Sequence, residues 1–537
     1  MVRTARILMR LVTIARTLAR HDALAVLEEL SPPPWVLWLA RRLPRRRVDG
    51  RSGQKLARAL TELGPSFIKL GQFLSTRADL LGETLAADLS DLQDRLPPFP
   101  AAEARAIIEA ELGQPLARLF AHFEDEPISA ASIAQVHLAI TASADAGGDE
   151  RAPPDQTPDQ TADRTEAPSG AEPQPVAVKV LRPGIERAFE RDLDLLYWLA
   201  AVVERTRPRL RRFRPVAVVR QFESIVRVEM DLTMEAAAAS ELADNFDDDE
   251  TYRVPRVDWQ RTSRRVLTME RVGGIPLDDR AALLAAGIDL REVLTRAAAI
   301  FFNQVFRDGF FHGDQHPGNM FVDPNGNIVA VDFGIMGRLD QQTRTFLADM
   351  LLAFLARDYN RLAQVHVEAG YLPSGHPPEL FAQALRAVSE PIFDRPLHDI
   401  SVARLLGRLL SLSESFDMPV QPQLLLLQKN MVMAEGISRR LDPTLNIWTL
   451  AEPLIAAWMR ANRGPEARLR NAAREVGEAL ERLPSLLGRV EAAADALAEG
   501  GLRLHPESQA AMGGGTAWHI RALWLGLAAL ALFVALY

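Results

Sequence analysis

The stretch FFHGDQHPGNMFVDPNGNIVAVDFG, residues 310–334, is the part of the sequence that most strongly indicates the fold of this chain. It contains Asp314, Asn319 five positions later, and Asp332, which opens the tripeptide Asp-Phe-Gly. The turn DPNGN separates two apolar runs, which predicts a short hairpin that brings the three polar side chains together. Asp and Asn often only cap turns, but capping explains single residues and does not explain this combination.

Protein kinases carry the same residue types in the order H-R-D-x-x-x-x-N followed by D-F-G. In such a site one carboxylate orients the attacking hydroxyl, while an amide oxygen and a second carboxylate hold Mg²⁺ against the phosphates. The sequence therefore predicts that Asp314 is catalytic and that Asn319 and Asp332 are metal ligands. Mg²⁺ and ATP or ADP are the expected cofactors.

A nucleotide site of this kind also needs a lysine on a strand and an acidic partner on a helix. The alternating run PVAVKVL, residues 175–181, supplies Lys179, for which a solvated position at a strand end is the alternative. The candidate partners are Glu229, Asp231 and Glu235 in the segment EMDLTMEAAAAS. On one continuous helix Glu229 and Glu235 point about 120° apart, so a single helix could serve two different cations.

The second cation lies upstream, in the helical segment LGPSFIKLGQFLSTRADLL, residues 63–81. An amphipathic core helix explains its Leu and Phe residues. It does not explain Lys69 and Gln72, which lie three positions apart and therefore share one face.

The glycine-rich loop that ordinary kinases place over the phosphates is replaced by the alanine-rich stretch SAASIAQVH, residues 129–137. Glycine lets a backbone approach phosphate closely, whereas Ala134 at the centre of the stretch adds a methyl group and stiffens the loop. We therefore expect nucleotide to bind in an altered pose.

Together these motifs resemble the UbiB family of atypical protein kinase-like proteins, also called the AarF or ABC-one family, over roughly residues 60–450. The resemblance implies a role in ubiquinone (coenzyme Q) biosynthesis. It also implies a gate, in which Glu229 engages Lys69 of the K-x-G-Q pair Lys69 and Gln72, at the place where a kinase admits a protein substrate. Glu235 is implied to pair with Lys179, and both are implied to be catalytic together with Asp314. The residues expected to contact the nucleotide are Ala130, Ala131, Ser132, Ala134 and Lys179, with Glu270 and Val272 in the hinge.

Strands early in the chain and helices late predict a two-lobed α+β layout. With what the resemblance implies and with the apolar C-terminal segment, the expected fold is an α+β, two-lobed protein kinase-like fold with an N-terminal helical extension and a C-terminal membrane helix. The run 142–175 lacks Val, Ile, Leu and aromatic residues, so we expect a disordered insertion inside a hairpin. The expected domains are basic N-terminal helices (1–50), a K-x-G-Q helical extension (51–128), an N-lobe (129–272), a C-lobe (273–460), C-terminal helices and a linker (461–516) and a membrane anchor (517–537).

The net charge of −8 argues against a nucleic-acid partner, although arginines cluster in the first 47 residues. That basic segment could contact anionic lipid or could be a solvated helix face. The last sixteen residues carry no charge, and the segment 518–537 reaches about 30 Å as a helix, the thickness of a bilayer core. A helix packed on the protein is the alternative. We expect a single-pass or tail-anchored protein of the bacterial inner membrane with a cytoplasmic catalytic domain.

The expected partners are membrane lipid and quinone precursors or quinone-biosynthetic proteins, and a homodimer is a candidate assembly. Two other functions fit part of the pattern. Small-molecule phosphotransferases also use H-G-D-x₄-N, but they lack the K-x-G-Q helix. A nucleotide-gated scaffold would organise biosynthetic proteins without turnover, and an ATPase measurement with and without lipid separates that scaffold from an enzyme.

Overall fold

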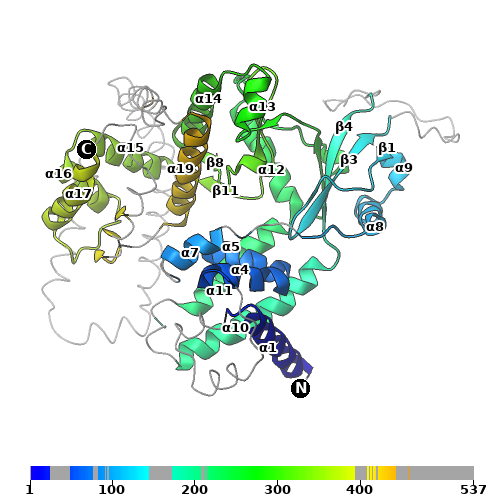
Figure 1. Cartoon of the computed structure of the whole chain (residues 1–537), viewed down its shortest axis with the longest axis horizontal. Coiled ribbons are helices and arrows are strands. Elements are labelled where there is room, and N and C mark those ends of the chain that lie inside the picture. The colour runs from blue at the N-terminus through cyan, green and yellow to red at the C-terminus, as the bar shows by residue number, and fades with distance from the viewer. Residues whose placement is uncertain are drawn as a thin grey trace, which may run out of the picture. The chain divides into compact units, whose positions relative to one another are not determined.

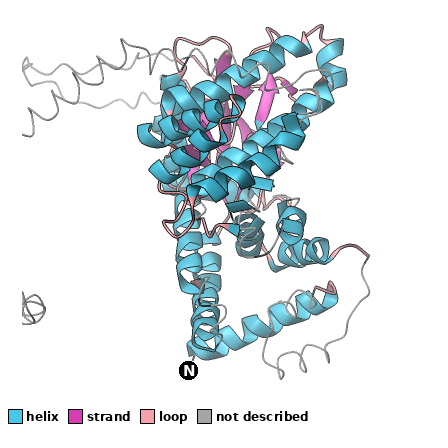
Figure 2. Cartoon of the chain, turned by 90° about the vertical axis from the view of Figure 1, so that its left-hand side faces the viewer, coloured by secondary structure: helices cyan, strands magenta, loops and turns pink. Residues whose placement is uncertain are grey.

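The structure of the chain is a computed structural model (Figures 1 and 2). It describes residues 2–23, 49–75, 81, 83–90, 92, 96–143, 172–206, 211, 214–393, 408–409, 412–413, 415–418, 421–442 and 458. Most of the expected insertion, the expected C-terminal helices and linker, and the expected membrane anchor lie outside these residues. Within the part of the chain that the structure describes, no helix is both long and apolar enough to span a bilayer.

The N-terminal helices pack on one another through a small apolar core that includes Leu60, Ile68 and Leu89. They are α1 (Val2–Arg20), α4 (Ser52–Leu63), α5 (Pro65–Ser75) and α7 (Glu83–Ser90). Part of the basic face of α1 is turned inward, because the guanidinium of Arg10 lies 2.8 Å from the carboxylate of Asp192, which is only 2% exposed.

The N-lobe is built around a five-stranded antiparallel sheet. Strands β1, β3, β4 and β6 lie side by side in this order, and β2 pairs with β3. Its strands are β1 (Phe120–Phe123), β2 (Ser129–Ala130), β3 (Ala134–Thr141), β4 (Pro175–Leu181) and β6 (Val266–Glu270). Helices α8 (Ala101–Leu112) and α9 (Leu116–Leu119) come just before the sheet, and α8 covers β4 and β6.

The predicted hairpin on either side of the insertion is present in the sheet. β3 and β4 run antiparallel, with Ala134 opposite Leu181 and Ile140 opposite Pro175. Strand β1 pairs with β3 although it precedes the domain boundary expected at residue 128, so the chain from α8 to β1 packs with the sheet.

The helical segment after β4 consists of α10 (Ile185–Thr206), α11 (Pro215–Glu229) and α12 (Leu232–Asn245). The prediction that one continuous helix carries both Glu229 and Glu235 is wrong. α11 ends at Glu229, and Asp231 caps α12 by accepting a hydrogen bond from the backbone N–H of Thr233. An Asp side chain at this position satisfies an otherwise unpaired amide and starts a new helix.

The C-lobe combines short strands with helices, several of which are labelled in Figure 1. A four-stranded sheet has the order β5-β10-β9-β7, and β8 pairs separately with β11. The strands are β5 (Tyr252–Arg253), β7 (Ile275–Pro276), β8 (Phe310–His312), β9 (Met320–Val322), β10 (Ile328–Ala330) and β11 (Met336–Arg338). The C-lobe helices are α13 (Arg280–Ala285), α14 (Leu290–Phe302), η3 (Asn303–Asp308), η4 (Pro317–Asn319), α15 (Gln341–Leu355), α16 (Tyr359–Glu368), α17 (Pro378–Phe393) and α19 (Pro422–Leu441). The short helix η2 (Trp259–Arg261) packs on β6 of the N-lobe sheet instead.

The helix that precedes the stretch 310–334 ends at a glycine. After α14 the chain continues as the π-helical turn η3 and stops at Gly309, whose φ of 68° favours glycine. Buried Gln304 in η3 accepts a hydrogen bond from the backbone N–H of His312, so the end of this helix fixes the start of the candidate site.

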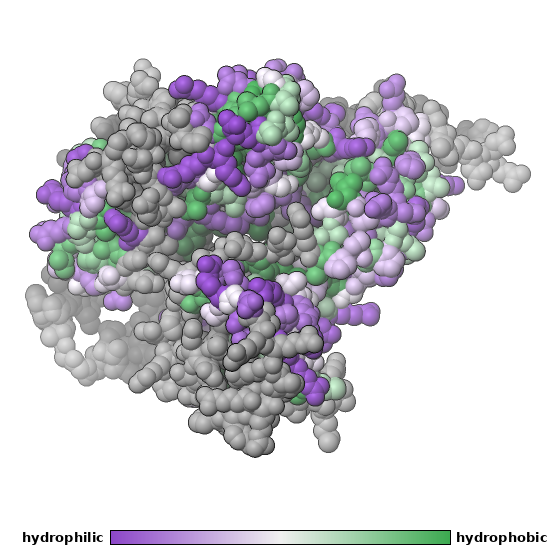
Figure 3. Space-filling model, in the orientation of Figure 1, coloured by the Kyte–Doolittle hydropathy of each residue, from purple (hydrophilic) through white to green (hydrophobic). Residues whose placement is uncertain are grey.

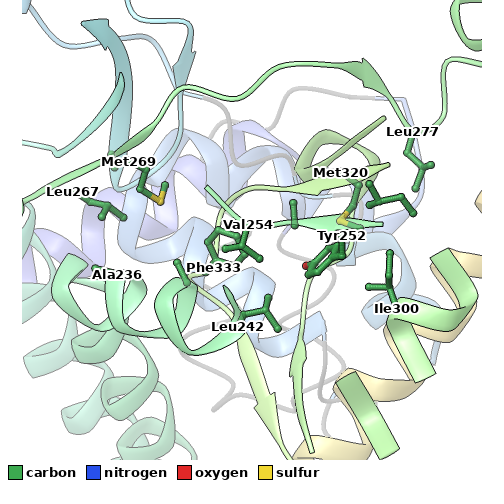
Figure 4. Packing of buried hydrophobic residues seen from close by; sticks show 14 of the residues in the cluster. Ala236, Leu242, Tyr252, Val254, Leu267, Met269, Leu277, Ile300, Met320 and Phe333 are labelled. Atoms are coloured by element: carbon green, nitrogen blue, oxygen red, sulfur yellow. The ribbon is translucent and has the colours of Figure 1, made fainter. Parts of the chain in front are cut away.

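A continuous hydrophobic core joins α12, β6 and the C-lobe strands. Figure 4 shows Phe333 among Ala236 and Leu242 of α12 and Leu267 and Met269 of β6. On the face shown in Figure 3 the described surface is mixed, with small hydrophobic areas among hydrophilic residues. The core, in contrast, links the two lobes directly at the position where the D-F-G tripeptide lies.

Candidate active site

Lys179 on β4 is the centre of an ion-pair network between the lobes. Its ammonium lies 2.7 Å from Glu235 of α12 and 2.9 Å from Asp332 of the D-F-G tripeptide. The lysine and Glu235 side chains are 14% and 6% exposed, whereas that of Asp332 is 52% exposed. The site is therefore closed on the helix side and open on the Asp332 side.

Burial and charge act against each other in this network. Burial alone lowers the pKa of Lys179, but the carboxylates of Asp332 and Glu235 outweigh it and raise that pKa above its ordinary value. The ammonium of Lys179 in turn holds the pKa of Asp332 well below its usual range. Burial raises the pKa of Glu235 to about 7, against the opposing effect of Lys179. Lysine and Asp332 thus stay charged near neutral pH, which suits binding of a phosphate and a metal ion.

The candidate catalytic loop, residues 313–319 after β8, is held by His312, which is fully buried. Its Nδ1 accepts a hydrogen bond from the backbone N–H of Asp314, and its Nε2 lies 3.4 Å from the carbonyl oxygen of Val331. Burial lowers the pKa of His312, so the neutral ring can accept at one nitrogen and donate at the other. This histidine ties the loop that carries Asp314 to the strand that leads to Asp332.

Gly313 replaces the arginine that ordinary kinases have before the catalytic aspartate. A Cβ atom at this position would lie 2.9 Å from the side chain and 3.0 Å from the carbonyl oxygen of Ile335. The close approach of the D-F-G segment therefore leaves no room for a side chain at residue 313.

Asn319 and Asp332 fit the donor set of a magnesium site. The side-chain amide nitrogen of Asn319 donates to the carbonyl oxygen of Asp314 at 3.1 Å, so this hydrogen bond does not use the side-chain oxygen that would bind a metal ion. Asp332 adopts φ of 64°, an uncommon left-handed conformation for a residue other than glycine. Only one of its carboxylate oxygens contacts Lys179. An amide oxygen and a half-exposed carboxylate are oxygen donors of the kind that Mg²⁺ takes together with nucleotide phosphates.

Most of the alanine-rich stretch is strand rather than loop, since Ser129 and Ala130 form β2 and the stretch from Ala134 onward belongs to β3. Ala134 does not lie in a loop: it is the first residue of β3, opposite Leu181, and its side chain is 1% exposed in the core. Ala131 forms the tight turn, in which its N–H donates to the carbonyl oxygen of Ala134 at 2.8 Å. Ala130 is partly exposed and Ser132 is buried. The methyl group of Ala134 thus packs in the core next to the turn and is not part of the loop itself.

The hinge residues follow the last strand of the N-lobe sheet. The N–H of Glu270 donates to the carbonyl oxygen of Arg256, and its carboxylate contacts Arg253 and Arg256. Val272 comes two residues later, beyond β6. The contact of adenine with Glu270 and Val272 stays a prediction.

The K-x-G-Q helix α5 is held by a second lysine–glutamate pair. The ammonium of Lys69 lies 3.0 Å from the carboxylate of Glu229 at the end of α11, and the two side chains are 11% and 10% exposed. Lys69 also contributes to the lowered pKa of Asp332, so its charge acts on the D-F-G segment. Gln72 lies one turn further along α5 and is partly buried.

Two residues that the sequence patterns did not suggest also contact the catalytic loop. From α19, the ammonium of Lys429 lies 2.6 Å from a carboxylate oxygen of Asp314. The neighbouring Asn430, fully buried, donates its side-chain N–H to the carbonyl oxygen of His312. Both are 115 or more residues away from their partners in sequence, and no spacing motif connects them.

Comparisons with known proteins agree with this arrangement. A model of the ABC1 atypical kinase-like domain matches residues 91–146 and 165–366, and a model of the UbiB helical domain matches residues 385–446. A solved structure from Mycobacterium tuberculosis, a complex with erythromycin, has a TM-score of 0.44 and 23% identity and covers 73% of this chain and 95% of its own, a likeness too weak to bear on the fold.

Curated relatives match over most of the chain, and each is named as a probable protein kinase UbiB. The relative from Marinobacter nauticus is 41% identical over 493 residues, which cover 89% of this chain and 84% of the relative. The relative from Pseudomonas putida is 38% identical over 530 residues, which cover 96% of this chain and 92% of the relative. With such identity over nearly the whole length, the chain belongs to the UbiB family of ABC1 atypical kinase-like proteins.

Proposed function

We propose that this protein is a Mg²⁺-dependent phosphotransferase or ATPase that supports ubiquinone biosynthesis at a membrane. The observation that carries the proposal is the network in which Lys179 contacts both Glu235 and Asp332. In protein kinases, phosphoryl transfer needs a strand lysine paired with a helix glutamate and a D-F-G aspartate that holds the metal ion, and this network brings all three residues together.

In this proposal each residue has a distinct task. Lys179, oriented by Glu235, binds the nucleotide phosphates, and Asp314 orients the attacking hydroxyl or water. Asn319 and Asp332 hold Mg²⁺, which neutralises charge on the phosphates when it is bound. The turn formed by Ala130, Ala131 and Ser132, together with Glu270 and Val272, contacts the nucleotide.

The K-x-G-Q helix is proposed to act as a gate. The Lys69–Glu229 pair holds α5 at the D-F-G side of the site, where it restricts entry of large substrates such as peptides. The proposed acceptor is accordingly small, a quinone precursor or water. Contact with membrane lipid at the bacterial inner membrane belongs to the same proposal and derives from the family role.

ATP hydrolysis by the purified full-length protein tests this function. Phosphate release is measured with and without vesicles of anionic lipid, and with and without phenolic mimics of quinone precursors. We expect Mg²⁺-dependent hydrolysis that rises with lipid or phenol. Nucleotide binding without any turnover under all four conditions would instead support the non-catalytic scaffold, for which the buried Lys69–Glu229 gate is the specific argument.

A further inference from the structure

A cation from the helical domain reaches the residue proposed to be catalytic. Lys429 lies on α19, within residues 385–446, whereas Asp314 lies within the atypical kinase-like domain, residues 165–366. Their side chains form an ion pair with a 2.6 Å separation. The site thus receives a charged group from outside the domain that carries its other residues.

The position of Lys429 is fixed by its neighbour. Asn430 is fully buried and contacts the loop on both sides of Asp314: it donates to the carbonyl oxygen of His312 and accepts from the backbone N–H of Gln315 at 3.4 Å. Further along α19, Ile437 and Leu441 are buried in the main core. These contacts fix α19 against the C-lobe and thereby place Lys429 next to the loop that carries Asp314.

The ammonium of Lys429 is not enclosed by protein. Its side chain is 38% exposed and that of Asp314 is 30% exposed, unlike the nearly buried Lys179 and Glu235. The loop from Asp314 to Asn319 contains no Lys or Arg of its own. A transferring phosphoryl group needs positive charge on its oxygens, and Lys179 already has two carboxylate partners.

We infer that Lys429 is a catalytic residue that contacts the terminal phosphate of bound ATP and holds Asp314 in place between turnovers. The inference rests on the proposed phosphotransferase or ATPase function. During the reaction the oxygen of water or of an acceptor hydroxyl forms a bond to the γ-phosphorus, while the bond from that phosphorus to the β,γ-bridging oxygen breaks and its electron pair leaves with ADP. The proton of the attacking oxygen passes to Asp314 or to solvent, and Lys429 stays protonated throughout.

The test compares Lys429→Met and Lys429→Arg with the matched control Arg440→Met. Methionine keeps the length and helix propensity of lysine without its charge. Arg440 lies on the same helix but pairs with Asp278 at 3.6 Å, away from the catalytic loop. ATP and ADP affinities are measured by calorimetry, kcat and KM by phosphate release, and folding by thermal melting.

In Lys429→Met we expect kcat to fall about 10- to 100-fold. ATP affinity should fall about 5- to 10-fold while ADP affinity stays nearly unchanged, because only ATP carries the contacted phosphate. Lys429→Arg should recover part of kcat, and Arg440→Met should match the wild type in both properties.

Three results would overturn the inference. The first is an unchanged kcat and ATP-to-ADP affinity ratio in Lys429→Met beside an active wild type, which leaves the proposed function intact. The second is a parallel loss of ATP affinity, ADP affinity and melting temperature, which indicates a structural ion pair. The third is a wild type that binds no nucleotide, which removes the proposed function as well. If Lys429→Met does not fold, a kcat in Lys429→Arg no higher than in Lys429→Gln contradicts the role.

Discussion

Two lysine–glutamate pairs lie on opposite sides of a two-residue break in one helical segment. Glu229 ends α11 and pairs with Lys69 of α5, while Glu235 lies in the first turn of α12 and pairs with Lys179 of β4. Both pairs are largely buried, with side chains 6–14% exposed. They differ in what else the lysine contacts, because Lys179 also reaches Asp332 at 2.9 Å.

In the proposed function, the Lys179 pair assembles the nucleotide site, whereas the Lys69 pair restricts access to it. The Lys179 pair joins a strand, a helix and the D-F-G segment, so its loss should disturb nucleotide binding itself. The Lys69 pair joins two helices beside the site, so its loss should change access. Asp231 caps α12 between the two glutamates, so that Glu229 lies at the end of one helix and Glu235 in the first turn of the next.

The largest effect is expected at the two aspartates of the opening stretch. Asp332→Asn should weaken Mg²⁺-dependent nucleotide binding by about 100-fold or more, because the metal loses its anionic ligand. Asp314→Asn should leave binding within a few-fold but lower turnover by about 100- to 10,000-fold, because only proton handling and orientation are lost. Calorimetry and phosphate release on both variants check this division, and equal loss of binding in both would contradict it.

Matched substitutions of Glu235 and Glu229 compare the two lysine–glutamate pairs directly. Glu235→Gln should lower nucleotide affinity about 10-fold, because Lys179 is then drawn toward Asp332, the residue that would otherwise bind the metal. Glu229→Gln is the matched control, since it alters the other pair by the same one-atom change, and its nucleotide affinity should stay within about 3-fold of the wild type. Titration of both with Mg-ADP is the measurement. A larger loss in Glu229→Gln would reverse the assigned roles.

The sequence predicted some parts of this site from local motifs and others only through the family resemblance. D-x₄-N and D-F-G indicated the catalytic loop because its residues are close in sequence and their spacing is set by one hairpin. The pairings of Lys69 and Lys179 were expected from the family resemblance, and both contacts are present. The roles attached to them stay predictions.

The contacts that α19 makes with the candidate site could not be predicted from the sequence. Lys429 and Asn430 come from a helix far along the sequence, and only the packing of α19 on the C-lobe brings them to Asp314 and His312. The break between α11 and α12 had a local signal, since an Asp at the N-cap position followed by an acidic residue in the first turn is typical of a helix start. That signal was missed because Asp231 was weighed as an ion-pair partner.

The cap at Asp231 offers a smaller test. Asp231→Ala should cost about 1 kcal/mol of stability, the usual effect of losing an N-cap, and should also weaken nucleotide binding a few-fold as Glu235 loses its orientation. Asp358→Ala removes the N-cap of α16, away from the candidate site, and should lower stability alone. Denaturant melts and nucleotide titrations on both variants separate the two effects. Equal nucleotide affinity in both would mean that the cap does not orient Glu235.

The smallest effect is expected at Ala134. Because its methyl group packs in the core beneath the alanine-rich turn, Ala134→Gly should cost about 1 kcal/mol and loosen the turn. The ratio of ATP to ADP affinity should then shift by a few-fold, measured by calorimetry. Unchanged affinity for both nucleotides would make this stretch an ordinary strand end.

The gate itself is tested most directly at Lys69. Breaking a buried ion pair by removing one partner costs about 3–5 kcal/mol when burial is complete, and the residual exposure here makes the expected loss of stability smaller. Lys69→Ala should at the same time open the site, so that the protein phosphorylates itself in cis while its function in quinone synthesis is lost. The measurement is phosphate incorporation into purified wild type, Lys69→Ala and the double variant Lys69→Ala with Asp314→Asn. The account predicts more incorporation in Lys69→Ala than in the wild type and none in the double variant. A Lys69→Ala protein that folds but incorporates no phosphate and hydrolyses no ATP would contradict it, because Lys69 would then be an ordinary residue of the catalytic machinery.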